Sequence, residues 1–305
     1  MRRHRYLQWG FLTLLTGLAP VIYSRAARAP EVVPLRLVEQ ELVETDETER
    51  LYSIRFADPE GRRVDAYLRE PIAAVDAAGT GAGRKVPAVV LVAGRFTGRE
   101  AAKVIPGPLE SVMLAVEYPQ AIPVRVGVWE WIRSLPAIRR SARRMPGILR
   151  GAAYHLAERP EVDAARIGLV GVSFGVPFAA AAGNDRVFGA VALHYGGSNL
   201  ASLFRANLPV ENGWVRWVVG GFAGWWFREM DPGRHVAKIS PTPLLLINAT
   251  ADDMIPHEAA LRLASHALQP YRHVWLPYGH LSSTEVEVIR EVADSTFRYF
   301  GFRRD

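Results

Sequence analysis

Hydrophobic residues follow two patterns along this chain, and together the patterns predict an α/β fold. Three segments near the beginning alternate apolar and polar residues, which is typical of strands that bury one face. Six later segments are short and mostly apolar, as in strands buried inside a parallel sheet. The alternating segments are 37–43, 51–56 and 64–68, and the mostly apolar ones are 87–92, 111–118, 166–170, 191–194, 243–248 and 272–277. We therefore expect a mostly parallel central sheet with helices on both faces and antiparallel strands at its beginning.

All of these strands fit one domain, residues 30–305. The chain has 305 residues, of which 49% are hydrophobic and 22% charged, which is ordinary for a globular protein with a substantial core. Residues 73–85 are rich in Ala and Gly and are expected to form an exposed loop.

Residues 200–237 are more numerous than a crossover between two strands requires, so we expect a small lid-like insertion there. The segment is rich in aromatic residues, which favours an apolar acyl pocket or membrane contact. The alternative is a cap helix buried on the core. The aromatic residues are Trp214, Trp217, Phe222, Trp225, Trp226 and Phe227.

Residues 125–150 are both basic and aromatic, and the chain as a whole carries a formal net charge of +6. One interpretation is a helix that packs its apolar side on the sheet and leaves its arginines in water. The other is a patch that lies against anionic lipid. No nucleic-acid-binding motif accompanies the charge, so a nucleic acid partner is not expected.

The N-terminus predicts a membrane or secreted location. Residues 1–5 are basic, and residues 6–23 form an uncharged, mostly apolar run. We expect residues 1–29 to be a signal-anchor or signal peptide, with membrane contact through residues 6–23 and the domain outside the cytoplasm. Residues 24–26 are a candidate small-residue cleavage site, and an uncleaved signal-anchor is the favoured interpretation. The alternative is a buried N-terminal helix.

Several kinds of chemistry lack their sequence signatures. The chain has no cysteine, which excludes disulfides, thiolate metal sites and a cysteine nucleophile. It also has no H-E-x-x-H metal motif, no G-x-G-x-x-G motif and no P-loop. We therefore expect neither a metal nor any other cofactor.

The segment Gly171-Val172-Ser173-Phe174-Gly175 follows the apolar run 166–170 and precedes 176–183, a predicted helix with a small-residue face. This order of strand, tight turn and helix fits a nucleophile elbow, in which the serine Oγ is exposed on a strained turn. Gly171 and Gly175 remove the Cβ atoms that would collide with the neighbouring strand and helix. Ser173 is therefore the candidate nucleophile.

A serine nucleophile requires a base and an acid, and both follow in the chain. Asp252 and Asp253 lie in a loop after the strand 243–248, and His280 follows the strand 272–277. Parallel strands direct their carboxyl ends to one edge of the sheet, so these residues are expected to meet Ser173 there.

In this combination the chain resembles the α/β-hydrolase superfamily, over about residues 35–302. Residues 161–168 and 191–197 resemble the branch of dienelactone hydrolases and acyl-peptidase-like esterases. The stretch 252–256, Asp-Asp-Met-Ile-Pro, matches an acid loop of the form D-x-x-[VI]-P. The resemblance makes Asp252 the expected acid and Asp253 a solvated neighbour.

The resemblance implies an α/β-hydrolase fold and a serine hydrolase that cleaves a carboxylic ester or related acyl bond. We expect a small-molecule acyl substrate, and the aromatic residues of the segment 200–237 favour an apolar one. Backbone N–H groups of Phe174 and, by position, Arg95 are expected to bind the oxyanion, with Phe96 as the alternative to Arg95. Ala93 stands where the family commonly has His. The Arg95 side chain is expected either to meet an anionic substrate group or to lie solvated at the rim.

Three other functions stay open at this point. The same triad serves acyl-CoA thioesterases and acyl-peptidases. The third alternative belongs to a different class of function: a catalytically silent, membrane-tethered binding protein.

Overall fold

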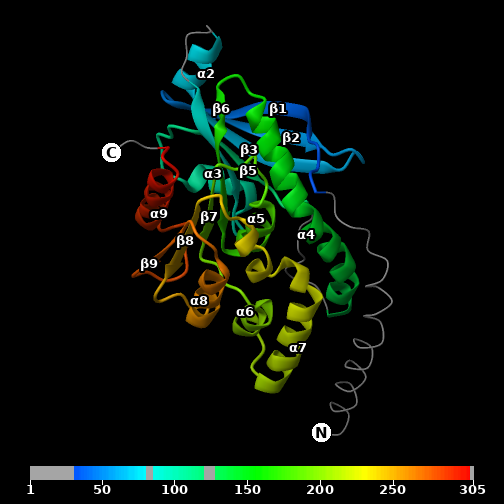
Figure 1. The fold of residues 1–305 in the computed structure, drawn as a ribbon. Helices are drawn as coiled ribbons and strands as arrows, with labels where there is room; N and C mark the ends of the chain where they lie inside the picture. Colours follow the sequence, from blue (N-terminus) through cyan, green and yellow to red (C-terminus); the bar gives the residue numbers. More distant parts are fainter. Residues whose placement is uncertain (1–30, 80–84, 120–127, 303–305) are drawn as a thin grey trace.

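A nine-stranded sheet forms the centre of the protein, seen here in a computed structural model that describes residues 31–79, 85–119 and 128–302 (Figure 1). The strands are β1 (Arg36–Thr45), β2 (Glu49–Ala57), β3 (Arg63–Pro71), β4 (Val86–Val92), β5 (Val112–Val116), β6 (Val162–Val172), β7 (Ala190–His194), β8 (Leu244–Ala249) and β9 (Tyr271–Leu276). Their order in the sheet is β1-β2-β3-β5-β4-β6-β7-β8-β9.

The sheet is antiparallel where it begins and parallel in the rest. The pairs β1–β2, β2–β3 and β3–β5 are antiparallel, and all pairs from β5 to β9 are parallel. In the middle of the sheet, Val90 of β4 lies opposite Leu114 of β5 and Leu169 of β6. The predicted fold class is thereby confirmed, and the carboxyl ends of the parallel strands share one edge.

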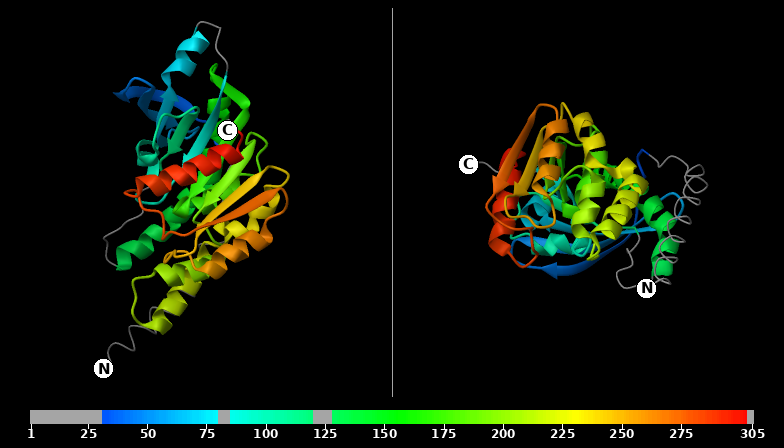
Figure 2. Two further views of the ribbon diagram at one scale, coloured as in Figure 1. Left: turned by 90° about the vertical axis from the view of Figure 1, so that its left-hand side faces the viewer. Right: turned by 90° about the horizontal axis from the view of Figure 1, so that it is seen from below.

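Helices cover both faces of the sheet. One face packs against α4 (Val128–Ala157), α5 (Val176–Ala182) and α8 (His257–His266), and the other against α3 (Ala101–Val104) and α9 (Val286–Tyr299). Figures 1 and 2 show α9 on the face opposite α4 and α5. The central strands divide their side chains between the two layers at a period of two, because successive residues of a strand point to opposite faces. Val90 and Val92 of β4 belong to one core, and Val89 and Leu91 to the other.

The arginines of α4 are paired within the protein to an extent that neither sequence interpretation anticipated. Arg144 forms an ion pair with Asp58, whose side chain is fully buried. Arg139 and Arg143 both bind the Glu229 carboxylate, with N–O distances of 2.9 and 3.1 Å. These three arginines therefore hold other segments of the chain to α4 rather than facing water or lipid.

Arg150 of α4 is also buried and acts on the helix that follows the candidate nucleophile. Its guanidinium donates to the carbonyl oxygens of Ala181 and Ala182, at 2.7 and 3.2 Å. These carbonyls belong to the last turn of α5, where helical partners are absent. Arg133 and Arg140 are the exposed arginines of α4 among the residues whose burial is described.

The segment with the expected lid forms a pair of helices, α6 (Leu200–Asn207) and α7 (Gly213–Trp226), followed by three short 3₁₀ turns. The two helices pack closely, since a Cβ at Gly220 or Gly224 would overlap atoms of Arg205 or Ala201 on α6. Figure 1 shows the pair beyond the sheet, below α5 and to the right of α8.

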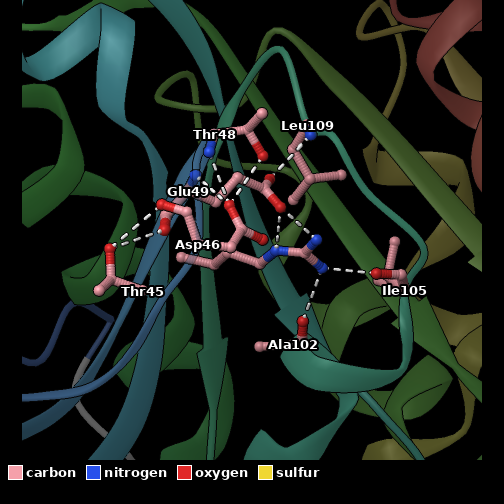
Figure 3. A network of polar contacts seen from close by, with 8 residues as sticks. Thr45, Asp46, Thr48, Glu49, Ala102, Ile105 and Leu109 are labelled. Carbon is pink, nitrogen blue, oxygen red and sulfur yellow. Dashed lines mark hydrogen bonds and ion pairs between the residues drawn. The ribbon is translucent and has the colours of Figure 1, made fainter.

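A buried ion pair connects the first strands to the loop between α3 and β5 (Figure 3). The Glu49 carboxylate binds the Arg69 guanidinium and accepts a hydrogen bond from Leu109 N at 2.8 Å. Arg69 also donates to the carbonyl oxygens of Ala102 and Ile105 at the end of α3. The network therefore fixes α3 from the side of the antiparallel strands.

Residues 73–85 were expected to be a loop, and this prediction is wrong for their first part. The helix α2 covers Ile72–Gly79. Four of its eight residues are Ala, the residue with the highest helix propensity. These alanines favour a helix in the first part of the segment, although glycines follow it.

The predicted anchor, residues 6–23 within 1–29, lies outside the described residues. Within the described part of the chain, no helix is both long enough and apolar enough to cross a bilayer. The described residues also contain no group of three or more His, Asp or Glu side chains arranged to hold a metal ion.

Candidate active site

Ser173 lies on a strained turn between β6 and α5. Its φ is +52°, a left-handed conformation that residues other than glycine rarely adopt. The two flanking glycines allow the turn to pack tightly, because a Cβ at Gly171 would overlap Ala179 and one at Gly175 would overlap the Val92 carbonyl. The serine is thus held at the carboxyl edge of the sheet.

His280 and Asp252 complete a chain of hydrogen bonds that begins at Ser173. Ser173 Oγ lies 2.9 Å from His280 Nε2, and His280 Nδ1 lies 2.9 Å from Asp252 Oδ2. Asp252 accepts a hydrogen bond from the protonated Nδ1, which leaves Nε2 free to accept the Ser173 proton. The His280 side chain is 12% exposed and that of Asp252 is 2% exposed, so water is largely excluded from the pair.

Two backbone N–H groups hold the Asp252 carboxylate in place. Asp252 Oδ1 accepts hydrogen bonds from Met254 N and Ile255 N, both at 2.8 Å. Asp253 is exposed. Asp252 is therefore the carboxylate that the structure brings to His280.

The loop after β4 lies next to the candidate nucleophile because β4 and β6 are neighbours. Val92, the last residue of β4, pairs with Gly171 of β6. Within the loop, the N–H groups of Thr97 and Gly98 donate to the Gly94 carbonyl at 3.1 and 2.9 Å. The loop thus turns directly beside Ser173, in the region where Arg95 and Phe96 were expected to supply an oxyanion donor.

The side chains of Arg95 and Phe96 are both exposed. The Arg95 guanidinium carbon lies 4.3 Å from the centre of the Phe96 ring, a cation–π arrangement. Phe96 is 77% exposed, which leaves a large apolar ring in water at this edge of the sheet.

Tyr118 is a residue of the site that the sequence analysis did not single out. Its hydroxyl donates to the Ala93 carbonyl, at the start of the loop after β4. Burial raises the pKa of Tyr118 well above its usual value, so the hydroxyl stays protonated and keeps this bond.

The ring of Tyr118 makes edge-to-face contacts with Phe174 and Phe178, at centroid distances of 5.4 and 5.7 Å. These three aromatic rings form an apolar cluster beside Ser173. A tyrosine at the carboxyl end of a predicted strand is the only sequence signal for this role.

Tyr195 is a second residue that the sequence analysis missed. It follows β7, has a left-handed φ of +54° and is fully buried. Its ring meets that of His280 edge to face at 5.6 Å. Burial, and then the charge of Asp252, raise the pKa of Tyr195 to about 12. Its hydroxyl has no hydrogen-bond partner among the described residues.

Comparisons with known proteins agree with this architecture. Residues 143–277 match the model of the prolyl oligopeptidase family. Acetyl xylan esterase 1 from Thermoanaerobacterium sp. JW/SL YS485 is 16% identical, over 91% of this chain and 90% of its own, with a TM-score of 0.61. The acetyl xylan esterase from Paenibacillus sp. R4 is 13% identical, over 94% of this chain and 92% of its own, with a TM-score of 0.55.

A puromycin-hydrolyzing peptidase from Mycobacterium tuberculosis is 18% identical, with a TM-score of 0.53, and covers 84% of this chain. The matched region is 46% of that peptidase. Curated protein sequences give no match. At these identities the structural similarities establish the fold, while the chemistry rests on the residues described above.

Proposed function

We propose that this chain, which has the α/β-hydrolase fold and matches the prolyl oligopeptidase family over residues 143–277, is a serine hydrolase that cleaves carboxylic esters. The observation that carries the proposal is the continuous hydrogen-bonded chain from Ser173 through His280 to Asp252, with Ser173 on a strained turn. Nucleophilic catalysis by serine requires a base within hydrogen-bond distance of the hydroxyl and an acid that orients the base, and the distances among these three residues support the proposal.

In the first half-reaction, Ser173 Oγ attacks the carbonyl carbon while its proton moves to His280 Nε2. Asp252 accepts the hydrogen bond from Nδ1 and stabilises the imidazolium that forms. The tetrahedral intermediate collapses when the carbon–oxygen bond to the alcohol breaks and His280 returns the proton to the leaving oxygen. The products are a free alcohol and an acyl group on Ser173.

In the second half-reaction, water attacks the acyl-enzyme and gives a proton to His280, which passes it to Ser173 Oγ as the acid leaves. In both steps the oxyanion would accept hydrogen bonds from Phe174 N–H and from Arg95 N–H, or from Phe96 N–H in its place. Each donor is worth about 3–4 kcal/mol of transition-state stabilisation. Tyr118 supports this region by holding the Ala93 carbonyl.

An apolar acyl group fits the surroundings of Ser173 better than a charged one. The cluster of Tyr118, Phe174 and Phe178 places aromatic rings directly beside the nucleophile. A small ester with an apolar acyl chain would bury its surface against the partly exposed residues Tyr118 and Phe174, which pack on the buried Phe178.

Amide or peptide hydrolysis is the second candidate. The match to the prolyl oligopeptidase family favours it, and the same triad serves both bonds. Parallel assays with a p-nitrophenyl ester and the p-nitroanilide of the same acyl group separate the two functions. An acyl-CoA assay tests the thioesterase alternative, and a protein inactive on all three would fit the silent binding protein.

A matched set of variants tests the mechanism. Ser173→Ala is expected to lower kcat for the ester on the order of 10⁶-fold. Asp252→Asn leaves His280 without its carboxylate and is expected to lower kcat on the order of 10⁴-fold.

The control is Asp253→Asn, which changes the adjacent, exposed carboxylate and is expected to keep wild-type kcat. Circular dichroism and thermal melting establish that each variant is folded. Equal losses in the Asp252 and Asp253 variants would contradict the assigned role of Asp252.

A further inference from the structure

Helix α7 has one face packed into the protein and one face in solvent. The packed face contains Gly220, Ala223, Gly224 and Trp226. The exposed side chains are Trp214, Trp217 and Trp225, at 57%, 61% and 39% exposure. Their spacing of three and eight residues places them on one side of the helix. We call these three residues the tryptophan face.

Positive charge accompanies the tryptophan face. The guanidinium of Arg205 lies 5.0 Å from the centre of the Trp217 ring, and that of Arg228 lies 5.5 Å from the Trp225 ring. Residues 200–228 contain three arginines and a single acidic residue, Glu211. Tryptophan beside arginine suits the interface of an anionic bilayer, where the ring sits at the level of the headgroups and positive charge attracts the anionic lipid.

The α6–α7 pair lies at the same edge of the sheet as Ser173. Helix α6 follows the carboxyl end of β7, and Asn207 at its end donates to the Met254 carbonyl at 2.8 Å. Met254 is two residues from Asp252 and is itself 43% exposed. The acid loop thus joins the α6–α7 pair directly to the triad.

The N-terminal apolar run would hold this edge near a membrane. Only seven residues, 24–30, separate the run from Glu31, a distance of at most about 29 Å. Val33 N donates to the Gly147 carbonyl on α4 at 2.9 Å. Arg143 lies one helical turn before Gly147 on α4, and it binds Glu229, which is three residues beyond the end of α7. The described chain therefore starts close to one end of the tryptophan face.

We propose that the tryptophan face of α7 docks on the surface of an anionic lipid bilayer, so that the edge of the sheet carrying Ser173 faces the membrane. Residues 6–23 then tether the chain, and α7 fixes its orientation. If the proposed esterase activity is correct, this orientation favours esters that are dissolved in the lipid surface. The docking surface itself does not depend on catalysis.

The absence of cysteine from residues 1–305 allows a site-specific test on this chain. Trp217→Cys, labelled with an environment-sensitive nitrobenzoxadiazole group, is reconstituted into vesicles of phosphatidylcholine and phosphatidylserine. The control is Leu42→Cys, labelled in the same way on β1 at the far end of the sheet, where Leu42 is 51% exposed (Figure 1). Emission wavelength, quenching by doxyl-labelled lipid and quenching by aqueous iodide are measured.

Docking predicts that the label at position 217 emits at shorter wavelength than the control, is quenched by doxyl lipid and is protected from iodide. A label at 217 that behaves like the label at 42 would overturn the proposal. Protection from iodide without quenching by doxyl lipid would also overturn it, because the face would then be covered by protein, such as a second copy of the chain. The same readings in a Ser173→Ala background separate this result from any failure of the proposed activity.

Discussion

At the scale of single residues, backbone N–H groups decide which of two adjacent carboxylates serves His280. Asp252 Oδ1 accepts hydrogen bonds from the N–H groups two and three residues later, which fixes the carboxylate with both of its oxygens near Nδ1 of His280, at 3.1 and 2.9 Å. Asp253, by contrast, is exposed. Ser173 is likewise positioned by the backbone, because it has a positive φ and lies in a tight turn between Gly171 and Gly175. The functional groups are therefore oriented before any substrate is present.

Tyr195 provides a prediction about stability at this scale. A buried hydroxyl without a partner costs about 1–3 kcal/mol, so Tyr195→Phe removes the penalty and keeps the ring beside His280. We expect the free energy of unfolding to rise by about 1 kcal/mol in urea titrations. A less stable Tyr195→Phe protein would mean that the hydroxyl makes a stabilising hydrogen bond in solution.

The order of Ser173, Asp252 and His280 could be predicted from the sequence, because each follows a recognisable strand in the order that the fold requires. Tyr118 and Tyr195 could not, since a single tyrosine at the end of a strand has no distinguishing pattern. Their roles arise only when neighbouring strands place Tyr118 against Ala93 and Tyr195 against His280.

At the scale of elements, hydrophobic pattern predicts the strands but not the partners of charged residues. The central strands are buried on both faces, so their apolar runs are visible in the sequence. The partner of Arg144 lies 86 residues away at Asp58, and that of Arg139 lies 90 residues away at Glu229. No local pattern encodes such pairs, and the arginines of α4 were therefore expected in water or against lipid.

The ion pair of Glu49 and Arg69 supplies a prediction about how elements are held together (Figure 3). Arg69→Met leaves the Glu49 carboxylate buried without its cation and removes the donors to the end of α3. Loss of one partner of a buried pair costs about 3–5 kcal/mol, which urea unfolding would detect.

The matched control is Arg290→Met on α9. Arg290 pairs with Glu287 across one helical turn, and both side chains are exposed, so the cost is expected to be below about 1 kcal/mol. Similar losses in the two variants would contradict the structural role of the Glu49–Arg69 pair.

At the scale of the whole molecule, one buried and three half-buried histidines make the fold sensitive to acid. Burial lowers the pKa of His155, His194, His235 and His273 from the usual 6.5, and that of His194 reaches about 3. Below pH 6.5 the unfolded chain therefore binds protons that the folded chain does not, and stability falls as the pH falls. The buried carboxyl group of Glu70, whose pKa burial raises, acts in the opposite direction.

The contribution of His194 can be isolated. Its Nε2 lies 3.0 Å from Thr296 Oγ1, and His194→Gln keeps a donor toward that oxygen without a titrating group. Between pH 6 and pH 4, the free energy of unfolding of the variant is expected to fall less steeply than that of the wild type, by up to about 1.4 kcal/mol per pH unit. Urea titrations at several pH values measure the slopes, and parallel slopes would contradict a neutral, buried His194.

The most direct test of the proposed activity is labelling of the purified protein with a fluorophosphonate probe, which reacts with activated serines. The structure predicts that the wild type is labelled and that Ser173→Ala and His280→Ala are not, because the nucleophile or its base is missing. Folded wild-type protein that resists the probe, or label that persists in Ser173→Ala, would contradict the assignment of Ser173 as a catalytic nucleophile.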